Sequence, residues 1–91
     1  MTYEIVLMDE AEIDAARLKR NEPHAYKKLI KLLKELEKHP TTGTGHPEQL
    51  RGDRSGQWSR HITDKHRLIY LIDNDTITVL VISAFGHYDD K

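Results

Sequence analysis

The side chains that could carry out chemistry are concentrated in the second half of this 91-residue chain. Between residues 39 and 72 there are five basic and three acidic side chains, together with four histidines. Because a histidine can gain charge beside an anion, this weakly basic zone is suited to a phosphate-bearing ligand. The candidates are one carboxylate, several guanidinium groups, two imidazoles and a phenol: Glu48, Arg51, Arg54, Arg60, His61, Arg67, His87 and Tyr88.

Taken one at a time, these residues have ordinary explanations as well as functional ones. Arg67 precedes an apolar run at 68–72, and an arginine entering a buried strand needs an anionic partner or a functional reason, since unpaired buried charge is costly. A structural ion pair would satisfy it equally well. Glu48 is typical of an exposed loop acid, and His87 of a surface histidine. Trp58 alternates with polar neighbours, which favours packing against the sheet over stacking on a base.

Composition argues against several other classes of protein. The absence of cysteine excludes a disulfide scaffold, a zinc ribbon and a thiol nucleophile, and favours a reducing cytoplasm. The six histidines lack close ligand spacing, so we expect no metal and no cofactor. No Walker-type loop, serine-hydrolase motif, signal-peptide core or apolar run of roughly 20 residues is present. The net charge of −1 leaves any nucleic-acid role to local clustering.

Hydrophobic periodicity predicts the elements that must position the candidate residues. Residues 3–8 are β-branched and apolar and predict a first strand, after which Asp9 fits the N-cap of a helix ending at about Arg20. Helically spaced apolar residues predict a second helix over 24–38. A long loop rich in glycine and proline follows at 40–56, and then three strands at about 57–63, 66–73 and 76–83.

This order, β-α-α-β-β-β, predicts a single α+β domain over residues 1–91, with two helices packed on an antiparallel sheet. Two questions stay open at this level. The lysine-rich face of the second helix is either a solvated surface or a face that contacts nucleic-acid phosphates. A two-residue turn at 64–65 would pair Ile62 with Arg67, whereas a three-residue turn would pair His61 with Arg67 and place both on one face beside Ser59.

An ordered series of short motifs from residue 39 to residue 88 resembles one known family. The series is similar to the YoeB/Txe group of bacterial toxins in the RelE/ParE superfamily, and the strand and two helices predicted before it are compatible with that fold. The motifs are His39-Pro40, Gly43-x-Gly45, Pro47-Glu48-x-Leu50, Ser55-Gly56-x-Trp58-Ser59-Arg60, Ile62-Thr63, His66-Arg67-Leu68-Ile69-Tyr70 and His87-Tyr88.

The resemblance implies a ribosome-dependent mRNA endoribonuclease that is neutralised by a partner antitoxin of the YefM/Axe type. It assigns Glu48 as general base, Arg67 as the arginine that stabilises the transition state, and His87 as general acid. Tyr88 would orient the site. The residues expected to contact substrate are Arg51, Arg60 and His61. A homodimer is compatible with the family, and no membrane partner is expected.

These three roles match metal-independent RNA cleavage by the neighbouring 2′-hydroxyl. That reaction needs a base for the hydroxyl proton, an acid for the leaving 5′-oxygen, and a cation facing the charge that builds on phosphorus. A carboxylate, an imidazole and a guanidinium can supply them.

The sequence also departs from the family pattern. His61 stands where a second arginine is usual, Phe85 where a basic residue is common, and Asp89-Asp90-Lys91 extend beyond Tyr88. We expect the two added acids to weaken attraction for RNA. The alternatives are therefore an inactive antitoxin-binding module and a gyrase-poisoning relative, although the latter does not need the Glu–Arg–His set.

Overall fold

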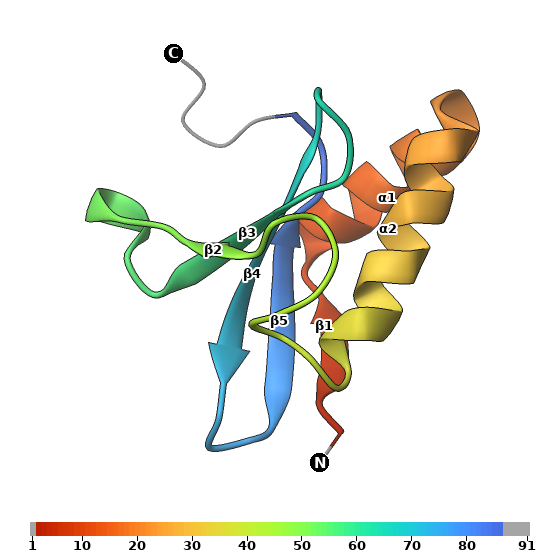
Figure 1. Cartoon of the computed structure of the whole chain (residues 1–91). Helices are drawn as coiled ribbons and strands as arrows, with labels where there is room; N and C mark the ends of the chain where they lie inside the picture. Colours follow the sequence, from red (N-terminus) through yellow and green to blue (C-terminus); the bar gives the residue numbers. More distant parts are fainter. Residues whose placement is uncertain (1, 87–91) are drawn as a thin grey trace.

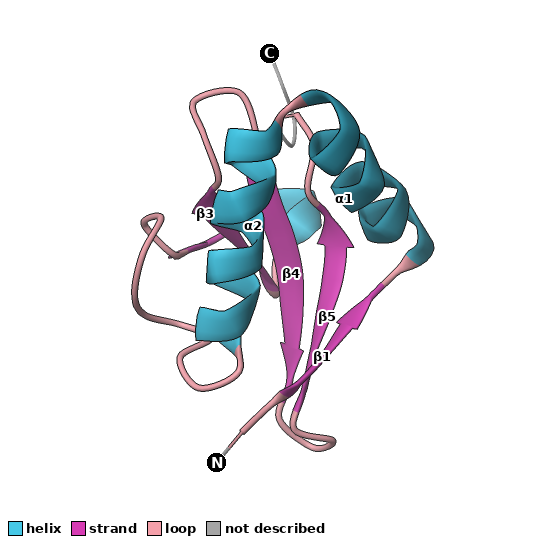
Figure 2. Cartoon of the chain, turned by 90° about the vertical axis from the view of Figure 1, so that its right-hand side faces the viewer, coloured by secondary structure: helices cyan, strands magenta, loops and turns pink. Residues whose placement is uncertain are grey.

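The computed structural model describes residues 2–86 as two helices packed on one face of a five-stranded sheet (Figures 1 and 2). A short 3-10 turn, η1 (Gly52–Arg54), lies between the second and third strands. The elements run in the order β1 (Glu4–Leu7), α1 (Asp9–Asn21), α2 (Pro23–Leu36), β2 (Glu48–Gln49), β3 (Gln57–His61), β4 (Arg67–Asp73) and β5 (Thr78–Ser83).

The sheet is mixed rather than antiparallel throughout, which corrects one part of the predicted architecture. Its strand order is β1-β5-β4-β3-β2, and β1 pairs parallel to β5 whereas the other neighbours pair antiparallel. The two helices form the crossover between β1 and the meander, and this connection lets the first strand lie beside the last. β2 is an additional strand of two residues, too short to produce the alternation that predicts strands.

The helices begin and end where backbone chemistry requires. Met8, not Asp9, occupies the N-cap of α1, so the predicted cap is wrong by one residue. Asp9 instead lies in the first helical turn, where the helix dipole favours acidic side chains. Pro23 opens α2 at a position where its missing amide proton costs nothing.

The core lies between the helices and the facing side of the sheet. Strand alternation sends Leu68 and Tyr70 of β4 toward the helices, together with Val79 and Val81 of β5. Ile69, between Leu68 and Tyr70, and its partner Ser59 on β3 point to the opposite face, and both are also buried. The apolar stripes of the helices complete the core with Ala11, Leu18, Ala25, Leu29, Leu32 and Leu36.

Candidate active site

The register of β3 and β4 settles which candidate residues share a face. His61 pairs directly with Arg67, and Ser59 pairs with both Ile69 of β4 and Glu48 of β2. Because alternate residues of a strand point to one face, Glu48, His61 and Arg67 all lie on the sheet face away from the helices. Of the two turn registers left open by the sequence, the chain adopts the one that groups these side chains.

The turn between these strands also orients Arg67. Its Nη1 donates hydrogen bonds to the backbone carbonyls of Thr63 (2.9 Å), His66 (3.3 Å) and Asp64 (3.4 Å). The Thr63 hydroxyl in turn accepts hydrogen bonds from the backbone amides of Lys65 and His66, which fixes the turn. Arg67 is only half-buried, so its charge lies at the rim of the sheet rather than inside the core.

His61 lies in a setting that keeps it neutral more readily than an exposed histidine. Burial lowers the pKa of His61, and the positive charge of Arg67 and the neighbouring His46 lower it further; Glu48 and Asp64 act weakly in the opposite direction. The His46 and His61 rings meet edge to face with centroids 5.7 Å apart. Arg67 and Glu48 both act on the pKa of this imidazole, as expected for charged side chains that lie on the same face of the sheet.

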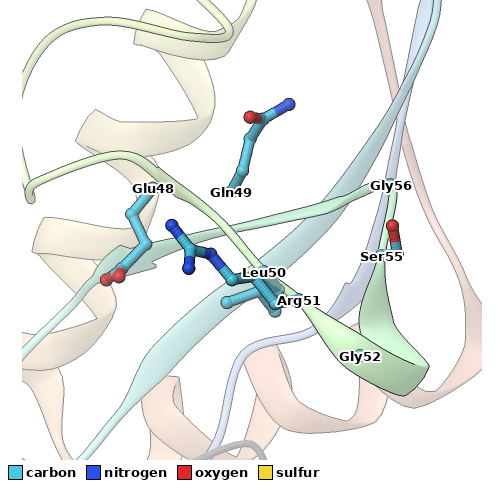
Figure 3. A pocket seen from close by; sticks show the side chains of 7 residues that line it. All are labelled: Glu48, Gln49, Leu50, Arg51, Gly52, Ser55 and Gly56. Atoms are coloured by element: carbon cyan, nitrogen blue, oxygen red, sulfur yellow. The ribbon is translucent and has the colours of Figure 1, made fainter.

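Glu48 and Arg51 line an open hollow of about 760 Å³ beside β2 and η1. Both side chains are exposed, and Figure 3 shows the Glu48 carboxylate and the Arg51 guanidinium on the same side of this segment, with Gln49 pointing away. Leu50 is buried next to them and ties the segment to the sheet. The hollow is therefore a polar, solvent-accessible surface with a carboxylate and a guanidinium at its edge.

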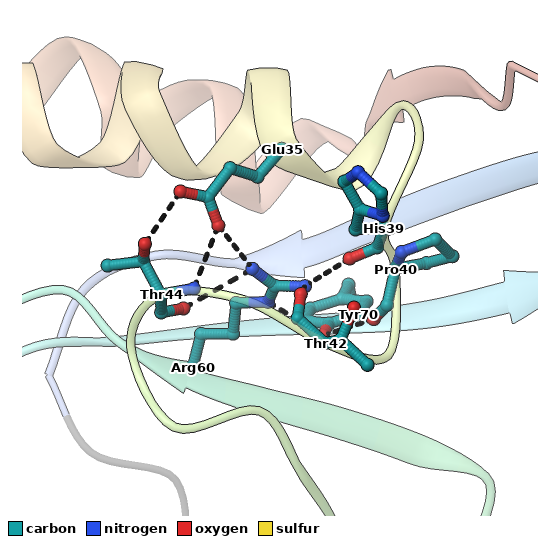
Figure 4. A network of polar contacts seen from close by, with 7 residues as sticks. All are labelled: Glu35, His39, Pro40, Thr42, Thr44, Arg60 and Tyr70. Atoms are coloured by element: carbon teal, nitrogen blue, oxygen red, sulfur yellow. Dashed lines mark hydrogen bonds and ion pairs between the residues drawn. The ribbon is translucent and has the colours of Figure 1, made fainter.

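Arg60 does not fit its predicted role in substrate binding. The side chain is completely buried, and it points to the helix side of the sheet because it alternates with Ser59 and His61. Its guanidinium donates to the Glu35 carboxylate (3.1 Å) and the Tyr70 hydroxyl (3.1 Å) (Figure 4). It also donates to the carbonyls of His39, Thr42 and Thr44. Arg60 is a structural residue that holds the loop after α2.

The partners of Arg60 form a network of their own. The Glu35 carboxylate accepts hydrogen bonds from the hydroxyl (2.7 Å) and amide (2.9 Å) of Thr44, which lower the pKa of Glu35 together with the Arg60 charge. The Tyr70 hydroxyl donates to the carbonyl of Pro40 (2.7 Å), and burial raises the pKa of Tyr70. The glycine-rich loop that leads to Glu48 is thereby fastened to the core.

His87 and Tyr88 lie outside the described residues, which end at Gly86. The carbonyl of Gly86 accepts a hydrogen bond from the amide of Arg67 (2.9 Å), so the described chain ends beside Arg67, one residue before His87. Phe85 packs against His66, and the guanidinium carbon of Arg17 lies 4.0 Å from the centroid of the Phe85 ring. This residue, noted as a departure from the family pattern, belongs to the packing of the chain.

His66, which had no predicted role beyond its place in a family motif, is 1% exposed and uses both ring nitrogens. The available signal was its place in the motif that contains Arg67. Over residues 2–86, no three histidine, aspartate or glutamate side chains gather in a way that could hold a metal ion. Within that same span, no helix is long and apolar enough to cross a bilayer.

The arrangement of two helices on a mixed sheet is shared with solved structures of small bacterial toxins of the YoeB/ParE class. The structure of a YoeB/ParE toxin from Agrobacterium tumefaciens superposes with a TM-score of 0.88 at 30% identity, covering 93% of this chain and 99% of that one. A YoeB–YefM complex from Staphylococcus aureus has a TM-score of 0.81 at 29% identity, covering 97% of this chain and 100% of that one.

Sequence comparison narrows the class to one family. Residues 8–88 match the family model described as YoeB-like toxin of bacterial type II toxin-antitoxin system. Toxin YoeB of Escherichia coli K12 is 32% identical over 84 residues, which cover 92% of this chain and 98% of that protein. Toxin YoeB of Mycobacterium bovis is 43% identical over 62 residues, 68% of this chain and 71% of its own. The chain belongs to the YoeB-like toxin family.

Proposed function

We propose that this toxin is a ribosome-dependent endoribonuclease that cleaves mRNA and so inhibits translation. The observation that carries the proposal is the placement of Glu48 and Arg67 on one face of the sheet, on either side of β3. Standard strand and residue spacings put their Cα atoms about 12 Å apart, which suits two long side chains that converge on one phosphate. The hydrogen bond from the Arg67 amide to the Gly86 carbonyl brings the described chain end beside Arg67.

In the proposed reaction the RNA supplies its own nucleophile. Glu48 removes the proton of the 2′-hydroxyl as its oxygen forms a bond to phosphorus, and Arg67 stabilises the negative charge that develops there. The bond from phosphorus to the 5′-oxygen breaks, and His87 donates a proton to that oxygen. The products are a 2′,3′-cyclic phosphate and a 5′-hydroxyl end. Tyr88 is assigned to orienting the site, and Arg51 and His61 to contacting the flanking phosphates.

The partners follow from the family and from the chemistry. The Staphylococcus aureus relative forms a complex with YefM and a dimer, and we assign to this chain a YefM/Axe-like antitoxin and the capacity to dimerise. An antitoxin segment that orders on binding can cover a large surface of its partner. The ribosome and its bound message are the substrate, which places the activity in the cytoplasm.

The decisive experiment maps the 5′ ends of cellular messages after induction of wild-type toxin and of Glu48→Gln. We expect new 5′-hydroxyl ends with the wild type and their loss with the variant, because removal of a general base costs roughly 10²–10⁴ in rate. Gln49→Ala is the matched control, since Gln49 is adjacent on β2 but points away from Glu48 (Figure 3). Equal cleavage by Glu48→Gln and wild type would contradict the proposal, and growth arrest with intact messages would favour the gyrase-poisoning alternative.

A further inference from the structure

His66 occupies a buried junction between three parts of the chain. It lies in the turn that precedes β4, beside the loop that joins α1 to α2 and beside the residues that follow β5. Its Nε2 lies 3.0 Å from a carboxylate oxygen of Glu22, and its Nδ1 lies 2.8 Å from the backbone nitrogen of Gly86. The Phe85 ring covers the imidazole, with ring centroids 4.3 Å apart.

The identity of these partners fixes the protonation of the ring. The Gly86 backbone nitrogen can only donate, so Nδ1 must offer its lone pair and carries no proton. The Glu22 carboxylate accepts, so the ring proton lies on Nε2. Lys65, whose Nζ lies 3.9 Å from the other Glu22 oxygen, is exposed and adds little to this arrangement. The imidazole is therefore neutral and held in one tautomer.

The same contacts determine where the chain leaves the sheet. Gly86 donates its amide to His66 and accepts the amide of Arg67 through its carbonyl (2.9 Å). The amide and the carbonyl of Gly86 are thus held by two consecutive residues, His66 in the turn and Arg67 at the start of β4. Gly86 immediately precedes His87, so any loss of this anchor changes the starting point of the segment that carries the proposed general acid.

We propose that His66 is a positioning residue for the toxin's reaction: its neutral imidazole, oriented by Glu22, anchors Gly86 beside Arg67, one residue before His87 in the sequence, the proposed general acid. The consequence for cleavage rests on the proposed function, whereas the anchor itself does not. Displacement of a reacting group by about 1 Å can cost on the order of 10²-fold in rate.

Two variants separate the two ends of the imidazole. Asparagine places its amide oxygen near the position of Nδ1 and keeps an acceptor for Gly86, while it gives up Glu22. Glutamine places its terminal amide near the position of Nε2 and keeps the contact to Glu22, while it gives up Gly86. Both remove an aromatic ring from the same buried site, so a merely structural role predicts similar losses for the two.

The test compares wild type, His66→Asn and His66→Gln by cleavage of message on programmed ribosomes, measured as single-turnover rate with saturating toxin. We expect His66→Gln to fall about 10- to 100-fold and His66→Asn to stay within about threefold to fivefold of wild type. The amide of Gly86 should exchange slowly with solvent in wild type and His66→Asn and rapidly in His66→Gln. Equal rates for the two variants, at equal folded fractions, would overturn the positioning role.

A measurement on the wild-type protein requires no variant to fold. A scalar coupling between the Gly86 amide nitrogen and His66 Nδ1 arises only across an N–H···N hydrogen bond, and we expect nitrogen-correlated NMR to detect it. Its absence, with a protonated Nδ1, would overturn the anchor. If the coupling is present but wild-type toxin leaves messages intact, the anchor stands and the proposed endoribonuclease function is what fails.

Discussion

Arg60 shows how a single arginine can organise a segment that has little regular structure. Between the end of α2 and β2 the chain has neither helix nor strand, and its backbone carbonyls need donors. The planar guanidinium supplies them in several directions, reaching the carbonyls of His39, Thr42 and Thr44 as well as the Glu35 carboxylate. A lysine has a single ammonium group and cannot reproduce this fork of donors.

We therefore expect Arg60→Lys to lower the free energy of unfolding by about 3 kcal/mol. This is the lower end of the cost measured when one partner of a buried ion pair is removed. Urea unfolding followed by the fluorescence of Trp58, the one tryptophan of the chain, measures the change. Arg51→Lys is the control and should change stability little, since Arg51 is exposed at the hollow. Equal stability of Arg60→Lys and wild type would show that the network is dispensable.

His61 makes one part of the site depend on pH. Its lowered pKa means that the ring is neutral near pH 7 and gains charge only below the ordinary value of 6.5. If it contacts a phosphate, affinity for the ribosome-bound message should rise as the pH falls through this range, by roughly tenfold, as expected for one charge-assisted hydrogen bond of about 1.5 kcal/mol. His61→Arg should bind more tightly at pH 7.5 and lose that rise, because its charge is permanent.

Binding of the Glu48→Gln variant, which lacks the proposed general base, to programmed ribosomes, measured from pH 5.5 to about pH 8 at constant ionic strength, tests this prediction. His46→Gln in the same background is the control, because His46 is a second histidine and its ring contacts His61. A pH dependence of binding that persists in His61→Arg but disappears in His46→Gln would assign the effect to His46 and contradict the prediction.

Among the elements, the loop after α2 depends on a close approach of backbone to backbone at Gly45. Its carbonyl accepts a hydrogen bond from the amide of His61 (2.7 Å), and its φ of +87° lies in the left-handed region that favours glycine. A Cβ at this position would lie 2.8 Å from the carbonyl oxygen of His61. The loop and β3 can therefore meet at this distance only through glycine.

Gly45→Ala should consequently destabilise the protein more than Gly52→Ala does, by about 1–3 kcal/mol. Gly52 is a matched control because it also has positive φ (+66°), yet a Cβ there meets no atom within 4 Å. Chemical unfolding of both variants under identical conditions gives the difference directly. Equal losses would mean that left-handed strain alone, and not the contact with β3, sets the requirement for glycine.

Much of the element pattern could be predicted because it is encoded locally. The period of apolar residues gave α2, and the β-branched runs gave β3, β4 and β5 within a few residues of their observed bounds. The parallel pairing of β1 with β5 joins residues more than 70 positions apart, such as Glu4 and Thr78, and no local signal reports it. β2 is too short to have any period.

The candidate site was predictable to a similar depth. Glu48 and Arg67 were found through the motif, and the structure places both on one face. Arg60 was misassigned because arginine beside a proposed phosphate site is usually taken as a ligand, and its burial depends on which way one β3 side chain points. The role of His66 could not be predicted because it depends on hydrogen bonds with Glu22 and Gly86, and both residues are remote in sequence.

At the scale of the whole molecule, one core serves every element. The Cα radius of gyration of the described residues is 12.1 Å, close to the value of about 12 Å expected for a compact chain of this length. Within residues 2–86, the apolar stripes of α1 and α2 are buried against each other and against the helix-facing side of the sheet. Isolated helices of this length are marginal in water, so neither layer should persist without the other.

We therefore expect the chain to unfold as one cooperative unit, in agreement with its prediction as a single domain. The two layers can be followed separately: far-UV circular dichroism is dominated by α1 and α2, whereas fluorescence reports on Trp58 in β3, which pairs with Tyr70 of β4. In a two-state transition the two signals give the same midpoint and the same denaturant dependence.

The variant Arg60→Lys tests the coupling of the two layers most directly, because Arg60 joins β3 to Glu35 of α2 and to the loop between them. If the layers are coupled, this variant shifts both transitions together. A fluorescence transition that precedes the loss of helical signal would instead show that the β2–β4 end of the sheet, and the candidate site with it, unfolds on its own.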